Sequence, residues 1–470
     1  MDGLDARLFS WPMNLSSFTM SDNESTTIDL INELKWRGLL KDCTDEPGLK
    51  AHLESGTRKI YAGFDPTADS LTIGNLVPIM LLAHVKRAGH TPVVVMGGGT
   101  GLIGDPSGKS AERQMMTAEM VQHNVDCQRP IYDAVLGSFA GPDHALLDNN
   151  EWLSKISFIE ALRDIGKHFS VNMMMQKESI KERLNNREQG ISYTEFSYMI
   201  LQAYDFAHLY EHEGVTVQLG GSDQYGNILA GTDLIRRQTE DREFRRKEAA
   251  GEDSSFIGYD EVWFGLTAPL VSKADGGKFG KTETGAVWLT ANRTSPYAYY
   301  QFWLNSSDED AANWIKVFTF LDQATVEGLI ARHSENPGKR ELQRTLAQEA
   351  TTILHGQAAM DNAEAAGKAL FSGEISSLDA QTMLEVFASV PTTEHAKADL
   401  SEGVEMVGLL KACNLASSNR EAKEFLNEGS VKINGEKIDI DTKLTQSHLL
   451  HDSYIAIRRG KKKWHMTKWA

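Results

Sequence analysis

An alternation of strand and helix patterns near the start of the chain limits the fold more than any other feature of the sequence. Lys59–Phe64 is a β-type run, Ile73–Arg87 has the apolar spacing of a helix, and Pro92–Met96 is apolar throughout. A continuously apolar strand is typical of a parallel sheet covered on both faces. A further strand, 215–219, follows several helical patterns. The sequence therefore predicts an α/β fold with a doubly wound, Rossmann-like parallel sheet.

The composition is that of a globular protein of several domains. The 470 residues are 41% hydrophobic and 24% charged, and no apolar run is long enough for a membrane span. The three cysteines stand far apart, which disfavours a disulfide framework or a zinc site and suits the cytoplasm. The net charge is −17, but the last 14 residues carry only basic charges. We therefore expect any RNA contact at that end.

Three glycine-containing segments have the form of nucleotide-binding loops. Asp65–Asn75 leads into a helix N-terminus, which favours phosphate, although a plain helix cap is the commoner explanation of such a loop taken alone. Val215–Asn227 is a β run that ends in glycines and presents Asp223 and Gln224 at the carboxyl end of the strand. Lys278–Thr282 is either a surface turn or a glycine-hinged loop whose two lysines close over phosphates.

Two other glycine motifs fail as nucleotide sites. Residues 99–104 match the dinucleotide fingerprint G-x-G-x-x-G, but Pro106 follows closely and interrupts the helix that this fingerprint requires. Residues 108–110 resemble the end of a P-loop, but Ile103 occupies the position of the required glycine. What remains is a glycine-rich loop beside the sheet that carries Asp105, Lys109 and Arg113.

A row of polar side chains follows one face of a predicted helix. Tyr198, Gln202 and Asp205 are spaced i, i+4 and i+7 among apolar neighbours. Burying such a row without partners is costly, so a solvent-exposed stripe is the first interpretation of this segment by itself.

In this order along the chain, the three glycine segments resemble the nucleotide signatures of the class I aminoacyl-tRNA synthetases. The residues around them resemble the bacterial tyrosine-specific group of that family, over roughly 29–470. The match has departures. Thr72 and Asn75 stand where the family usually has the two histidines of His-Ile-Gly-His, and Tyr225 and Ala62 replace a frequent Trp and Cys. Thr and Asn still donate hydrogen bonds to phosphate but do not become cationic.

The resemblance implies a role for each matching residue, and it favours burial of the polar row. Recognition of tyrosine is implied for Tyr61, Asp105, Tyr198, Gln202, Asp205 and Gln224. Binding of ATP is implied for Gly63, Asp65, Gly74, Asp223 and Lys281. Stabilisation of charge on the reacting phosphate is assigned to Thr67, Thr72, Asn75, Lys109, Arg113, Lys278, Lys281 and Thr282.

The resemblance also implies a reaction and its partners. ATP, accompanied by Mg²⁺, activates L-tyrosine, and tRNA(Tyr) then receives the tyrosyl group; the family acts as a homodimer. No tightly bound cofactor or dedicated metal site is expected. One alternative is the sister enzyme that charges tryptophan, which Tyr61, Asp205 and the C-terminal module disfavour. Another is an inactive RNA-binding paralogue, which only Thr72 favours.

The expected domain plan follows from these motifs. It comprises a flexible extension or misassigned start (1–28), a catalytic domain (29–270), a linker with the lysine loop (271–295), an α-helical anticodon-side domain (296–367), a loop-rich linker (368–402) and an RNA-binding domain (403–470). The mixed-charge run 236–260 is expected to be a solvated helix or loop.

The last of these domains is a small α+β module. Asn434-Gly435 predicts one hairpin, and Gly460 predicts a second between 454–459 and 463–468. The module resembles the RNA-binding domain named after ribosomal small-subunit protein four. RNA contacts are implied for Asn419, Arg420, Lys423, Arg458, Arg459, Lys461, Lys462 and Lys463.

Overall fold

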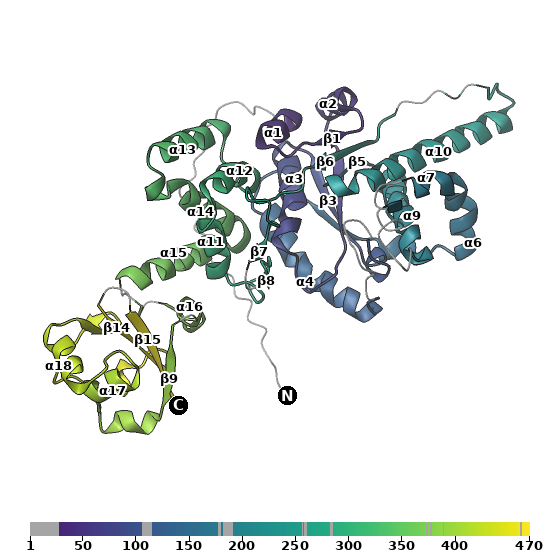
Figure 1. The fold of residues 1–470 in the computed structure, drawn as a ribbon. Helices are drawn as coiled ribbons and strands as arrows, with labels where there is room; N and C mark the ends of the chain where they lie inside the picture. The colour runs from purple at the N-terminus through teal and green to yellow at the C-terminus, as the bar shows by residue number, and fades with distance from the viewer. Residues whose placement is uncertain are drawn as a thin grey trace, which may run out of the picture.

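The structure is a computed structural model (Figure 1). It describes residues 28–105, 115–176, 180–181, 191–255, 257, 261–282, 285–372, 375–376, 378–388, 390–460 and 463–470. The expectations for residues 1–27, Lys109, Arg113, Lys461 and Lys462 therefore fall outside the described residues.

A six-stranded sheet forms the centre of the first half of the chain and confirms the α/β expectation. Its order is β1-β6-β5-β2-β3-β4, and every neighbouring pair is parallel except β1 with β6. From β2 the chain passes to β3 and β4 on one side and then returns to β5 and β6 on the other. The carboxyl ends of β2 and β5 thus form the switch point where ligands bind in such sheets. The strands are β1 (Asp42–Cys43), β2 (Lys59–Phe64), β3 (Thr91–Met96), β4 (Ala145–Asp148), β5 (Val215–Gly221) and β6 (Phe264–Ala268).

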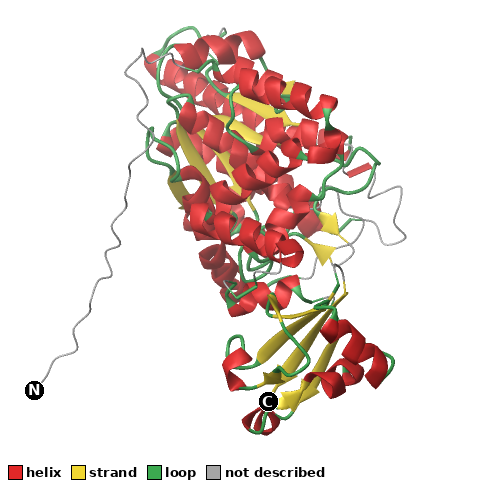
Figure 2. Ribbon diagram, turned by 90° about the vertical axis from the view of Figure 1, so that its left-hand side faces the viewer, coloured by secondary structure: helices red, strands yellow, loops and turns green. Residues whose placement is uncertain are grey.

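Helices cover both faces of this sheet (Figure 2). Helix α3 (Leu76–Arg87) is buried along almost its whole length, because it lies between the sheet and helices α1 and α12. Its continuous apolar sequence fits that position. The other helices of this half are α1 (Leu30–Arg37), α2 (Glu46–Glu54), α4 (Ala118–Leu136), α5 (Asn150–Leu153), α6 (Phe158–Glu160), α7 (Val171–Met175), α9 (Tyr193–His208) and α10 (Tyr225–Ala250).

Helix α10 contains the first part of the mixed-charge run and extends away from the sheet (Figure 1). Its charges pair along the helix surface: Arg236 bonds to Asp233 and Glu240, and Arg246 bonds to Glu243. The solvated helix that the sequence allowed for 236–260 is therefore found up to Ala250, and the pairs support it by about 0.3–0.5 kcal/mol each.

A helical unit packs directly against the α/β unit. It consists of α11 (Pro296–Leu304), α12 (Asp308–Phe318), α13 (Gln323–Glu335), α14 (Glu341–His355) and α15 (Gln357–Ser372). One continuous hydrophobic core joins the two units, from Leu30 through Leu289 to Ala363. The buried Arg37 of α1 strengthens this junction, because its guanidinium donates to the carbonyls of Lys316, Thr319 and Leu321 at 2.7–2.8 Å.

The C-terminal module lies at the opposite end of the molecule from α10 (Figure 1) and has a core of its own. Its five-stranded sheet has the order β12-β11-β14-β15-β9. Both predicted hairpins are confirmed: β11 pairs with β12 across Asn434 (φ 50°) and Gly435 (φ 93°), and β14 pairs with β15 across Gly460. The elements are β9 (Thr392–His395), β10 (Val404–Glu405), α17 (Met406–Ala412), α18 (Asn419–Asn427), β11 (Val431–Ile433), β12 (Glu436–Lys437), β13 (Lys443–Leu444), β14 (Tyr454–Arg459) and β15 (Lys463–Trp469).

The segment 368–402 contains more regular structure than the loop-rich expectation. Helix α15 continues to Ser372, and α16 (Ala380–Val386) follows. Strand β9 then adds to the edge of the C-terminal sheet, parallel to β15. Met383 and Phe387 belong to a hydrophobic cluster with Ala456 and Met466 of that sheet. These contacts with residues far along the chain order the segment, and its own local composition does not reveal them. Within the described residues, every helix is too short or too polar to span a bilayer.

Candidate active site

A cavity of about 720 Å³ opens at the switch point between β2 and β5. Its walls come from the ends of both strands, the start of α3, one face of α9 and the segment after β6. The sequence-predicted residues that line it are Tyr61, Gly63, Asp65, Thr67, Thr72, Gly74, Asn75, Asp105, Tyr198, Gln202, Asp205, Asp223, Gln224 and Lys278. The fold therefore brings together side chains from all three glycine segments and from the polar row of α9.

Asp205 and Tyr61 form the deepest polar part of the cavity wall. Their side chains are 5% and 1% exposed. The carboxylate of Asp205 accepts hydrogen bonds from Trp152 Nε1 at 2.7 Å and from Asn149 Nδ2 at 2.9 Å. The hydroxyl of Tyr61 has no hydrogen-bond partner among the described residues. A buried hydroxyl without a partner costs free energy, so this position suits a ligand that carries a polar group.

Burial dominates the electrostatics of this pair. Desolvation raises the pKa of Asp205 to about 7, against the opposing effect of the hydrogen bonds from Asn149 and Trp152. Desolvation, and then the nearby Asp205 charge, raises the pKa of Tyr61 well above its usual value. Tyr61 is therefore a neutral hydroxyl, and the protonation of Asp205 changes near neutral pH.

A second polar group lies nearer the strand ends. Tyr198 donates from its hydroxyl to Asp65 Oδ2 at 2.9 Å, and Thr100 donates to Asp65 Oδ1 at 2.8 Å. Gln224 donates to Asp105 Oδ2 at 2.8 Å, which joins the end of β5 to the glycine-rich loop. These acceptors and the hydroxyl of Tyr198 form a negatively charged region, which favours an ammonium group.

The first signature is ordered by its own side chains. Thr72 donates from both its backbone N–H and its hydroxyl to Asn75 Oδ1, at 3.1 and 2.9 Å. Because the side-chain oxygen of Asn75 accepts these bonds, the donors that the loop can offer a ligand are the side-chain N–H groups of Asn75 and the backbone N–H groups at the start of α3. The pair is neutral, so this segment offers an anion hydrogen-bond donors and the helix dipole rather than a positive charge.

The lysine loop stands beside this signature. Residues 281–282 and 285–286 form a short hairpin, β7 (Lys281–Thr282) with β8 (Gly285–Ala286). Lys278 and Lys281 are exposed, and neither forms an ion pair with an acid of the described part of the chain. Lys278 lines the cavity, whereas Lys281 does not. The side chain of Thr282 lies outside what the structure describes.

The expected RNA-binding residues separate into two groups. Asn419, Arg420 and Lys423 are exposed on α18, as expected, and Lys463 is exposed at the start of β15. Arg458 is only 8% exposed, and its Nε donates to the carbonyl of Gly460. The half-buried Arg459 packs on Phe425 and donates to the carbonyl of Leu415. These contacts hold both arginines within the module, and the RNA contact expected for each of them stays a prediction.

Sequence reasoning missed Asn149 and Trp152, which hold Asp205. Both follow β4, whose carboxyl end lies beside that of β3. The signal was present: a short apolar run, 145–147, is followed by polar residues, as at the ends of β2 and β5. The run is too short to distinguish from other apolar stretches by pattern alone.

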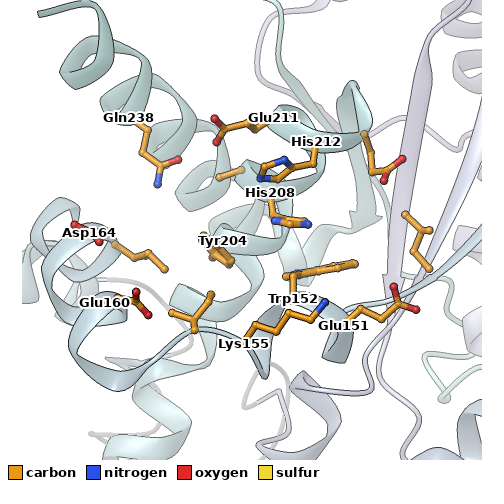
Figure 3. A pocket seen from close by; sticks show the side chains of 15 residues that line it. Glu151, Trp152, Lys155, Glu160, Asp164, Tyr204, His208, Glu211, His212 and Gln238 are labelled. Carbon is orange, nitrogen blue, oxygen red and sulfur yellow. The ribbon is translucent and has the colours of Figure 1, made fainter. Parts of the chain in front are cut away.

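Trp152 also lines a second cavity, of about 570 Å³ (Figure 3). The indole of Trp152 stacks on His208 at a centroid distance of 4.8 Å, and the same side chain bonds to Asp205. Several acids at its rim are paired outside the cavity, such as Glu211 with Arg242 and Glu213 with Lys59. None of the residues that the sequence predicts for the site lies in its lining.

Comparisons with known proteins agree with this geometry. The family described as tRNA synthetases class I (W and Y) matches residues 54–372, and the tyrosine–tRNA ligase C-terminal domain family matches 382–467. The chain therefore belongs to the class I tRNA synthetases of the W and Y group.

Tyrosine–tRNA ligase of Geobacillus stearothermophilus is 44% identical over 445 residues, 94% of this chain and all of the relative, and that of Bacillus caldotenax is 45% identical over the same share. Within the class, the chain belongs to the tyrosine–tRNA ligases.

Solved structures support the same assignment. The C-terminally truncated mitochondrial tyrosyl-tRNA synthetase of Aspergillus nidulans is 28% identical, with a TM-score of 0.64 over 73% of this chain and 94% of that one. The corresponding protein of Coccidioides posadasii is 31% identical, with a TM-score of 0.61 over 71% of this chain and 90% of that one.

Proposed function

We propose that the cavity at the switch point carries out both steps of the tyrosine–tRNA ligase reaction. In the first step, the carboxylate of tyrosine attacks the α-phosphorus of ATP, and pyrophosphate leaves. In the second, a terminal ribose hydroxyl of tRNA(Tyr) takes the tyrosyl group from the adenylate, and AMP leaves. The observation that carries the proposal is the buried pair of Asp205 and Tyr61 at the base of a cavity bordered by the first signature and the lysine loop.

The phenolic hydroxyl of the substrate is assigned to Asp205 and Tyr61. A tyrosine side chain with its hydroxyl there gives Tyr61 the partner that it lacks among the described residues. Phenylalanine in the same position leaves buried polar groups without a partner, at a cost of about 1–3 kcal/mol for each group. The α-ammonium group is assigned to Asp105, Tyr198 and Gln202, and Gln224 is assigned to the reacting carboxylate of the substrate.

The nucleotide is assigned to the strand ends and the two loops. Asp223, exposed in the turn after β5, is suited to accept from the ribose hydroxyls. Gly63 and Gly74 let the backbone approach the nucleotide. The attacking carboxylate is already an anion, so the first step needs no general base. Catalysis then consists of positioning and of charge stabilisation by Lys278, Lys281, Thr67, Asn75 and their neighbours.

We assign Mg²⁺ to the phosphates of ATP. The ion prefers phosphate oxygens with one or two carboxylates, and no group of three or more His, Cys, Asp or Glu side chains in the described residues is arranged to hold a metal ion. The metal, when bound, neutralises charge on the pyrophosphate that leaves.

Two further parts of the proposal concern assembly. We assign tRNA binding to the exposed face of α18 with Lys463, and we place the protein in the cytoplasm, as its bacterial relatives suggest.

We assign the homodimer interface to an exposed apolar face of α6, α7 and the start of α9. Exposed patches of this kind mark interfaces. Its side chains are Phe158, Ile159, Leu162, Val171, Met173, Met175 and Tyr193.

Amino-acid-dependent exchange of labelled pyrophosphate into ATP, without tRNA, tests the reaction directly. We expect exchange with tyrosine and none above background with phenylalanine or tryptophan. The Asp205→Ala variant should lose the preference for tyrosine over phenylalanine. Exchange with tryptophan would assign the chain to the sister enzyme. No exchange from folded protein would instead favour the RNA-binding paralogue, and tRNA affinity would then decide that case.

A further inference from the structure

The lysine loop is fastened to the helical unit at two points, both of which involve α12. In the segment that leads into the loop, four residues before Lys278, the backbone N–H of Ala274 donates to Asp310 Oδ1 at 2.8 Å. Asp310 lies in the first turn of α12 and is 7% exposed. A buried carboxylate that accepts a backbone N–H across two units holds that backbone in a defined place.

The second fastening point is the ring of Phe279, between the two lysines. It stacks on Phe318 of α12 with a centroid distance of 5.2 Å and an interplanar angle of 10°. It also meets Trp314 of α12 edge to face at 5.0 Å and Phe302 of α11 at 5.8 Å. Such a cluster gives the ring one preferred position.

The other side of the loop rests on the first phosphate signature. Gly280 has φ +73°, and a Cβ at this residue would lie 2.3 Å from Ile73 Cγ2. The backbone continues this contact, because Val287 N–H donates to the Gly280 carbonyl and Ile73 N–H donates to the Val287 carbonyl, both at 2.9 Å. The loop is thus enclosed between the Thr72–Asn75 signature and α12.

We propose that Phe279 and Asp310 are positioning residues that dock the lysine loop on α12 and thereby set where Lys278 and Lys281 reach the nucleotide. The inference rests on the function proposed for the two lysines. Lys278 precedes Phe279 directly, and Lys281 follows two residues later, so the position of one ring determines the backbone position of both. Neither lysine is held by an acid of the described chain, which leaves the backbone anchor as its restraint.

The main test compares Phe279→Ala with Phe279→Leu in the full-length protein. Misplacement of a charge-stabilising group by about 1 Å lowers a rate by as much as 100-fold. We therefore expect Phe279→Ala to lower kcat of tyrosine-dependent pyrophosphate exchange by roughly 10- to 100-fold. The affinity for tyrosine without ATP should stay unchanged. The leucine variant, which keeps an apolar anchor, should recover part of the loss. Asp310→Ala should act in the same direction.

Limited digestion with trypsin reports docking without reference to activity. When the lysine loop is docked on α12, the peptide bonds after Lys278 and Lys281 are held against the protein. In Phe279→Ala we expect cleavage after these two lysines to be at least several times faster than in the unchanged protein. Phe320→Ala is the matched control, because Phe320 is another half-buried ring of the helical region that packs on Phe139 and His84, away from the loop.

Two results would overturn the inference. One is a loss of exchange in Phe279→Ala no larger than in Phe320→Ala. The other is a tryptic pattern at Lys278 and Lys281 that does not change. If Lys278→Ala and Lys281→Ala keep full exchange, the role proposed for the lysines fails instead. The rate of tryptic cleavage then decides by itself whether Phe279 docks the loop.

Discussion

At the scale of single residues, Asp205 shows how the fold changes the chemistry of a side chain. An aspartate in water is ionised at neutral pH, but burial raises the pKa of this carboxyl to about 7. The unfolded chain therefore loses this proton near pH 4, whereas the folded protein keeps it until about pH 7. The stability that this group contributes is complete below pH 4 and is lost as pH rises to 7.

We predict that the Asp205→Asn variant lacks this loss of stability with pH. The free energy of unfolding of the unchanged protein should fall, relative to that of the variant, by at most about 4 kcal/mol between pH 4 and pH 7.5. Urea unfolding of both proteins across this range measures the difference. The asparagine amide will face either the Trp152 or the Asn149 donor, which adds a cost that does not depend on pH. Only the change with pH of the difference in unfolding free energy between the two proteins tests the prediction. A difference that stays constant from pH 4 to pH 7.5 would contradict the raised pKa.

At the scale of elements, α18 presents polar and charged side chains that its own module does not bury. Ala422 and Leu426 point into the module core, while Asn419, Arg420 and Lys423 are exposed on the same short helix. The amphipathic spacing visible in the sequence thus determined which side chains remain available for RNA.

We predict that Arg420→Ala with Lys423→Ala weakens tRNA binding and reduces its dependence on salt. Each lost phosphate contact should lower the slope of log K against log salt by about 0.7–0.9. Filter binding at several salt concentrations measures the slope, and pyrophosphate exchange should not change. Lys411→Ala removes an exposed charge from α17 of the same module and serves as the control. An equal effect of the control would indicate a general effect of charge rather than a contact face.

At the scale of the whole molecule, the hydrophobic clusters show which parts of the chain pack together. The α/β and helical units share one hydrophobic core, which contains Ile73 of the first signature and Trp314 and Phe318 of α12. A separate cluster contains Tyr61, Trp152 and Phe206, which lie at the site. The C-terminal module is built around a separate core, joined to α15 and α16 by a smaller cluster. The apolar face of α6 and α7 lies on the α/β unit, far from that module (Figure 1).

We predict that Phe158→Glu converts a dimer into a monomer. Phe158 is 67% exposed within the apolar face, where a carboxylate brought into an interface costs several kcal/mol. Sedimentation at micromolar concentration measures the change in mass. Phe244→Glu is the control, since Phe244 is 44% exposed on α10 and outside this face. If the two variants have the same mass as the unchanged protein, the face is not the interface.

Local patterns predicted much of this protein. The strands 59–64, 92–96 and 215–219, both C-terminal hairpins and the polar face of α9 all lie where the sequence indicated. Residues near one another in the chain encode such elements, because hydrophobic period and turn chemistry act within a few residues. The three glycine segments were visible for the same reason.

By itself, then, the sequence determined the elements, the signatures and the family that they resemble. Only the tertiary structure decided which distant side chains complete them. Asn149 and Trp152 reach Asp205 across more than 50 positions, and Phe279 meets Trp314 and Phe318 of another unit. It also decided that Arg458 is buried and that β9 joins the C-terminal sheet. Such contacts gain their free energy from burial and packing between separate segments, which no local window of sequence contains.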